Sequence, residues 1–75
     1  MLTDTQCRMA RAALGWGVRE LAKAAGVSAN TIARFESGKK ANPATLKVIR
    51  QAFEAAGVEF TNGDAPGVRL HRKKQ

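Results

Sequence analysis

Residues 22–40, AKAAGVSANTIARFESGKK, contain the feature that most constrains the fold: a helical sequence that stops at Gly26 and restarts almost at once. Glycine readily adopts the positive φ of a sharp helix stop, and Ser28 is a strong N-cap for the helix that follows. Ile32 and Phe35 have the spacing of a buried face on this next helix. The stretch therefore predicts two helices held at a fixed angle, with the second helix directing its N-terminus outward.

Helix signals also occur on both sides of this stretch. Thr3 and Gln6 have the spacing of a capping box, and Pro43 stands at the first position of a helix that Gly57 would terminate. Apolar residues recur every three or four positions between these signals. The sequence predicts a mainly α fold with four helices, over about residues 4–14, 18–25, 29–37 and 43–56.

The pattern changes after Gly57. VEF and VRL alternate apolar and polar residues, and the segment between them, TNGDAPG, is rich in turn formers, with Asn62–Gly63 as the expected reversal. A short C-terminal β-hairpin over residues 58–70 follows. Because an isolated two-stranded ribbon is marginal in water, it should pack on the helices or pair with another chain. We expect residues 1–57 to form the helical domain and residues 71–75 a basic tail, which either adds nonspecific affinity or is only solvated.

Charge is the most informative part of the composition. Thirteen Lys and Arg against six Asp and Glu give a net charge of +7 and a pI near 10.6 in 75 residues. Such an excess favours a polyanionic partner, most often nucleic acid, over a merely soluble basic protein. The single cysteine, Cys7, excludes an internal disulfide and fits a reducing compartment. No apolar run reaches the ~20 residues of a membrane helix, so we expect a cytoplasmic protein without a membrane partner.

The stretch GWGVRELAKAAGVSANTIARFESGKKANPATL closely resembles the Cro and lambda-repressor-like helix-turn-helix family, also called the xenobiotic-response-element type. The resemblance covers roughly residues 5 to 57 and rests on L-A-x-x-x-G-V-S followed by T-I-x-x-x-E-x-G. It implies a DNA-binding regulator of the bacterial or phage type, whose third helix enters the major groove by its N-terminal residues.

The resemblance also implies roles for single residues. Arg11 and Glu36 match a structural ion pair between the first and third helices, and the base-reading positions fall on Ala29, Asn30 and Arg34. Asn suits adenine, Arg suits guanine, and an alanine methyl suits the methyl group of thymine. Asn30 could instead cap the helix or face solvent, and Arg34 could contact a phosphate or remain solvated.

Residues near the DNA backbone follow from the same resemblance. Where the family often has a glutamine at the start of the second helix, this chain has Val18, so the backbone NH groups and Arg19 are expected to serve the phosphate there. The predicted backbone contacts are Val18, Arg19, Ser28, Thr31, Ser37, Lys39 and Lys40.

The predicted function is a sequence-specific transcriptional regulator, a repressor or autoregulator that binds double-stranded DNA as a homodimer on an inverted repeat. The alternative is an antitoxin or antiactivator-type module that binds a protein partner through the C-terminal hairpin. The sequence has no acid pair, nucleophile set or phosphate loop, and His71 has no nearby Cys or His, so we expect neither an enzyme nor a cofactor or metal site. The candidates for dimerisation are the hairpin residues Val58, Phe60, Val68 and Leu70.

Overall fold

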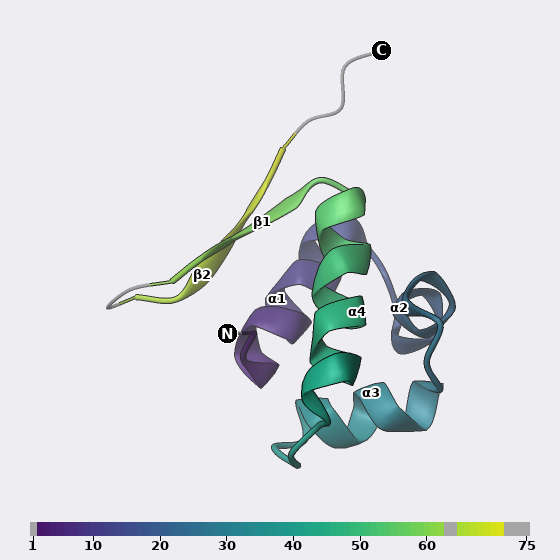
Figure 1. Ribbon diagram of the computed structural model, residues 1–75. Helices are drawn as coiled ribbons and strands as arrows, with labels where there is room; N and C mark the ends of the chain where they lie inside the picture. Colours follow the sequence, from purple (N-terminus) through teal and green to yellow (C-terminus); the bar gives the residue numbers. More distant parts are fainter. Residues whose placement is uncertain (1, 63–64, 72–75) are drawn as a thin grey trace.

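The computed structural model describes residues 2–62 and 65–71 and confirms a mainly α fold with a C-terminal hairpin (Figure 1). The predicted reversal at Gly63 and the predicted basic tail, apart from His71, lie outside the described residues. The elements in chain order are α1 (Asp4–Leu14), α2 (Val18–Ala25), α3 (Ala29–Glu36), α4 (Pro43–Ala55), β1 (Val58–Thr61) and β2 (Gly67–Leu70).

The corner between α2 and α3 has the predicted chemistry. Gly26 ends α2 with a φ of 74°, and its NH donates to the carbonyl of Ala22. The Ser28 hydroxyl then accepts a hydrogen bond from the backbone NH of Thr31 at 3.1 Å and caps α3. Because a left-handed residue costs little only when it is glycine, this position fixes where α2 stops and the direction in which α3 leaves.

The helices surround one small core. Its most deeply buried large side chains come from different elements: Leu21 of α2, Ile32 of α3, and Ile49 and Phe53 of α4. In Figure 1, α3 crosses the end of the molecule at which α4 begins, while β1 leaves the other end of α4. The N-terminal half of α3 therefore lies at one end of the domain, with its inner face held by the core.

The hairpin packs on the helices of its own chain. The two strands are antiparallel, with Val58 opposite Leu70 and Phe60 opposite Val68; β1 contacts α4 and β2 contacts α1. Val58 and Phe60 are buried, and the Phe60 ring meets the Phe53 ring edge to face at 5.8 Å. These contacts supply the apolar cover that an isolated two-stranded ribbon lacks.

Gln6 joins the hairpin to α1. Its Nε2 donates to the carbonyls of Thr61, at 3.0 Å, and Gly67, at 3.1 Å, which are opposite residues at the loop end of the ribbon. Its Oε1 accepts from the backbone NH of Thr3, which completes the capping box of α1. The side chain is fully buried, so a single residue both caps the first helix and anchors both strands.

Candidate nucleic-acid interface

Helix α3 has a buried inner face and a polar outer face. Ile32 is fully buried and Phe35 is 8% exposed, whereas Asn30 and Arg34 are exposed. The side chains of Asn30 and Arg34 form no hydrogen bond or ion pair with any other described residue. A base edge in the major groove could therefore reach both side chains without displacing an existing contact.

The first turn of α3 contains the remaining predicted contacts of this helix. Ala29 is half-buried, and the hydroxyls of Ser28 and Thr31 lie 2.8 Å apart. Ser28 also caps the helix through its hydroxyl, so part of its hydrogen-bonding capacity is used within the protein. The structure brings these three residues together with Asn30 at the same helix terminus, which carries partial positive charge.

The start of α2 contains one residue that packs on the core and one that is exposed to solvent. Val18 is half-buried and packs against the core, while Arg19 is exposed. The carboxylate of Glu20 accepts a hydrogen bond from the backbone NH of Gly17 at 2.8 Å, so one of the free NH groups of this helix end is already satisfied. The backbone at Val18 and the guanidinium of Arg19 are the groups at this helix end that could reach a phosphate.

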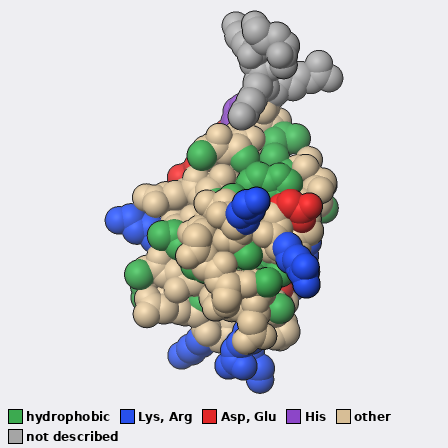
Figure 2. All heavy atoms as spheres, turned by 90° about the vertical axis from the view of Figure 1, so that its right-hand side faces the viewer, with side chains coloured by type: hydrophobic (Ala, Val, Ile, Leu, Met, Phe, Trp, Pro, Cys, Tyr) green, Lys and Arg blue, Asp and Glu red, His purple; other side chains and the backbone are tan. Residues whose placement is uncertain are grey.

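The loop after α3 adds positive charge. Ser37 donates through its hydroxyl to the carbonyl of Arg34 at 2.8 Å, and the backbone NH of Lys39 donates to the same carbonyl at 3.1 Å. Lys39 and Lys40 are exposed and form no ion pair among the residues that the structure describes. Figure 2 shows Lys and Arg side chains, and no Asp or Glu, at the end of the molecule where α3 lies.

An ion pair behind this surface ties α3 to α1. Arg11 binds Glu36 in a two-pronged arrangement, Nε to Oε2 at 2.8 Å and Nη2 to Oε1 at 2.7 Å, and its Nη1 donates to the carbonyl of Trp16 at 3.1 Å. The Arg11 side chain is 20% exposed and that of Glu36 is 9% exposed. Arg11 is therefore held as a structural residue, turned toward the protein and bonded at all three guanidinium nitrogens.

Cys7 and Arg8 complete this network, although no local pattern in the sequence indicates a role in it for either residue. The Cys7 thiol donates to Glu36 Oε2 at 3.1 Å, and Arg8 Nη1 donates to the backbone carbonyl of Glu36. Burial acts to raise the pKa of the Glu36 carboxyl, but the hydrogen bonds from Arg11 and Cys7 and the nearby positive charges outweigh it, so the net pKa is lowered. Burial, followed by the hydrogen bond to Glu36, raises the pKa of the Cys7 thiol.

Charged groups on the hairpin form a separate cluster, on the strand face opposite Val58 and Phe60. His71 Nε2 lies 2.6 Å from Glu59 Oε1, and Arg69 Nη1 lies 3.9 Å from the same oxygen. The hydrogen bond with His71, followed by the charge of Arg69, lowers the pKa of the Glu59 carboxyl. Among residues 2–62 and 65–71, no three His, Cys, Asp or Glu side chains gather as a metal site would require.

The comparisons with known proteins agree with this geometry. A family model described as a helix-turn-helix domain matches residues 5–61, which is most of the chain. The match includes α2, α3 and the corner between them, together with β1. No curated protein matches the chain significantly. Within the part of the chain that the structure describes, no helix is both long enough and apolar enough to cross a membrane.

Proposed function

Because this chain belongs to the helix-turn-helix domain family, and is in general terms a DNA-binding regulator, we propose that it is a sequence-specific transcriptional repressor or autoregulator. In this proposal it binds an inverted repeat as a homodimer, with one α3 in the major groove of each half-site. The two recognition helices would then lie about 34–36 Å, one helical turn of DNA, apart.

The observation that carries the proposal is the outer face of α3. Asn30 and Arg34 are exposed, and their side chains form no hydrogen bond or ion pair with other described residues, although the helix behind them is fixed by Ile32, Phe35 and Glu36. A rigid helix with unpaired polar groups on its outer face is suited to reading base edges. Asn30 would bind adenine and Arg34 guanine, while Ala29 would contact a thymine methyl.

Positive groups around this face would position the helix on the duplex. Arg19, at the start of α2, and Lys39 and Lys40, after the end of α3, are exposed. Thr31 in the first turn of α3 and Ser37 at its end add hydroxyl groups. Contacts to phosphates fix register and orientation without reading sequence. Their contribution should fall steeply as salt is raised, because each neutralised phosphate releases counterions.

The dimer contact is proposed at the hairpin. Val58 and Phe60 are buried in the core of their own chain. The surface that remains for a second copy consists of the strand edges and the side chains of Val68, which is half-buried, and Leu70, which is 46% exposed. A single small module buries little surface on DNA, which is the physical reason to expect two copies. Leu70→Asp should give monomers while leaving the core intact; a variant that still sediments as a dimer would exclude this contact.

Selection from a library of random duplexes tests the DNA-binding proposal. We expect an inverted repeat to be enriched, with log affinity falling in log salt by about 0.9 per phosphate contacted. Arg34→Ala should relax the preference at one position per half-site, whereas Lys39→Ala should weaken all sequences alike. Lys23→Ala, which removes one positive charge from an exposed site on α2 to which no DNA or dimer contact is assigned, is the matched control and should change neither. Weak, uniform binding with no enriched sequence would refute a sequence reader.

A second candidate function uses the hairpin differently. Among the described residues, neither strand edge of the hairpin pairs with a further strand, and Leu70 is an exposed large apolar side chain. These features suit strand addition by another protein, as an antitoxin or antiactivator would require. The outward-facing Asn30 and Arg34 favour the DNA-binding proposal, because a pure protein binder has no need of them. Analytical ultracentrifugation of the chain alone shows whether it is a dimer or a monomer. A dimer fits a hairpin that pairs with a second copy, and a monomer fits a hairpin left free for a protein partner.

A further inference from the structure

A groove of about 810 Å³ shares Lys39 and Lys40 with the proposed DNA contacts, but the rest of its lining has no part in the proposed function. It is bounded by the start of α1, the loop between α3 and α4, and the first half of α4. Its apolar lining consists of the buried Leu2 and Phe35, the half-buried Ala41 and Leu46, and the exposed Pro43. The volume lies within the range of ligand-binding clefts in proteins, about 300–1,000 Å³.

The charges around this groove are strongly unbalanced. Four cationic residues line it, Lys39, Lys40, Lys47 and Arg50, against a single acidic residue, Asp4. Asp4 lies 3.7 Å from Arg8, and Arg50 is paired with Glu54 at 2.9 Å, so partners outside the groove lining already compensate these two charges.

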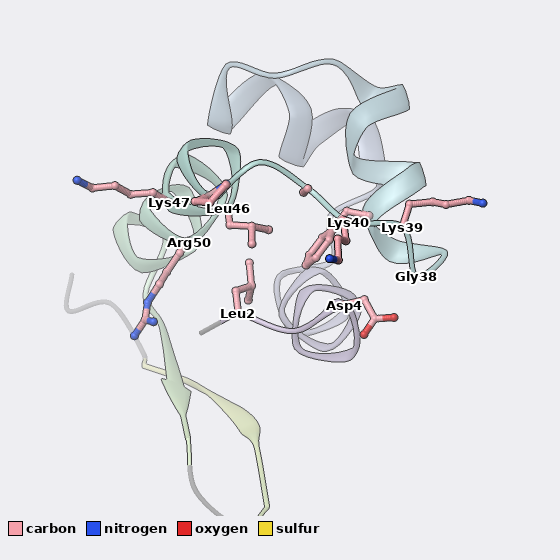
Figure 3. A pocket seen from close by; sticks show the side chains of 11 residues that line it. Leu2, Asp4, Gly38, Lys39, Lys40, Leu46, Lys47 and Arg50 are labelled. Atoms are coloured by element: carbon pink, nitrogen blue, oxygen red, sulfur yellow. The ribbon is translucent and has the colours of Figure 1, made fainter.

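The three lysines are left as uncompensated charges, because none forms an ion pair with another described residue. Figure 3 shows Lys39 and Lys47 extending from opposite sides of the groove, while Lys40 ends between them. Leu2 and Leu46 approach each other in the middle. The groove thus combines an apolar centre with positive charge on both rims.

This combination discriminates between possible occupants. A second copy of the chain carries a net charge of +7 and would bring like charge to the lysines. Nucleic acid would satisfy the lysines but would leave the half-buried Leu46 and the exposed Pro43 without apolar partners. A peptide that alternates large apolar and acidic side chains satisfies both, since its apolar residues fill the centre and its carboxylates meet the rims.

We propose that this groove is a docking site for an acidic, amphipathic segment of a partner protein. The segment carries one or two large apolar side chains, such as Leu or Phe, that pack on the half-buried Leu46 and the exposed Pro43. Asp or Glu residues on either side of these anchors pair with Lys40 and Lys47. The site is separate from the strand edges of the hairpin, which offer main-chain pairing instead.

Selection from a displayed library of random peptides tests the proposal directly. Peptides of about 15 residues, roughly four helical turns, are selected on the full chain in the absence of DNA, so the outcome does not depend on DNA recognition. The most enriched peptide is then titrated by fluorescence anisotropy. Chemical shifts of the backbone amides map where it binds. We expect enrichment of sequences that combine Leu or Phe with Asp or Glu, and shifts centred on Leu2 and Leu46.

Variants separate the groove from general charge attraction. Lys47→Glu and Leu46→Ala should each weaken the selected peptide about tenfold, as substitutions of central interface residues do. Lys23→Glu changes charge by the same amount at an exposed site on α2, outside the groove lining, and should weaken it less than twofold. Circular dichroism checks that each variant is folded. Equal binding to all three variants, enrichment of peptides without the acidic-apolar combination, or no enrichment at all would overturn the proposal.

Discussion

Replacing Glu36 with glutamine tests how the recognition helix is held. The substitution keeps the size of the side chain but removes the charge that binds Arg11 through two hydrogen bonds, at 2.8 and 2.7 Å. A hydrogen bond to a charged group contributes about 1.5–3 kcal/mol, and glutamine can still accept one of the two bonds. Removing a partner from a fully buried pair costs about 3–5 kcal/mol, and this pair is only partly buried.

The free energy of unfolding should therefore fall by about 2–3 kcal/mol in Glu36→Gln. A 75-residue domain is expected to have only about 4–11 kcal/mol in total, so the loss is large. For a domain of this size it corresponds to a decrease in Tm of roughly 10–20 °C. Urea denaturation followed by circular dichroism measures the change.

The control is Glu54→Gln. Glu54 binds Arg50 at 2.9 Å, almost the same distance, but the side chains are 46% and 36% exposed. An exposed helical pair of this kind contributes only about 0.3–0.5 kcal/mol. If Glu36→Gln costs no more than Glu54→Gln, burial does not strengthen the Arg11–Glu36 pair and the reasoning is wrong.

The same pair predicts a dependence on pH. Because the pKa of Glu36 is lower in the folded protein than its ordinary value, the unfolded chain binds its proton more readily. The stabilisation is therefore fully present above the unfolded pKa, about 4.3, and is lost as the pH falls through the folded pKa. The difference in stability between wild type and Glu36→Gln should be constant near neutral pH and shrink in acid. A difference that grows in acid would contradict the lowered pKa.

Three further predictions concern the corner, the hairpin and the thiol. Gly26→Ala should cost about 1–2 kcal/mol by urea denaturation, because its φ of 74° disfavours a side chain although no atom lies within 4 Å of the added Cβ. Gln6→Ala should increase amide hydrogen exchange at Thr61 and leave α4 protected, because it removes both hydrogen bonds that tie the strand carbonyls to α1. If exchange increased equally in the hairpin and in α4, Gln6 would not be the anchor of the hairpin. Cys7 should react with a thiol reagent only as the domain unfolds, since it is fully buried and its pKa is raised; alkylation at the rate of a free thiol would contradict this.

The boundaries of the helices could be predicted from the sequence because they depend on local chemistry. Thr3, Gly26, Ser28 and Pro43 each act on backbone groups within a few residues, and the structure places α1 to α4 between them much as predicted. The outward face of α3 follows in the same way, because Ile32 and Phe35 fix which side of an eight-residue helix is buried. The ion pair of Arg11 with Glu36 was expected from the family resemblance, whereas spacing along the chain could not have indicated it.

Contacts between distant residues were decided only by the tertiary structure. The local sequence predicts only that Gln6 forms half of a capping box. Nothing nearby in the sequence indicates that its amide reaches the carbonyls of Thr61 and Gly67. The groove likewise brings Leu2 together with Leu46, so its apolar centre does not exist in any single segment. Local hydrogen bonds and periodicity determine where each helix begins and which face it buries. Which elements meet depends on packing the whole chain around one core, and that is a property of the folded molecule.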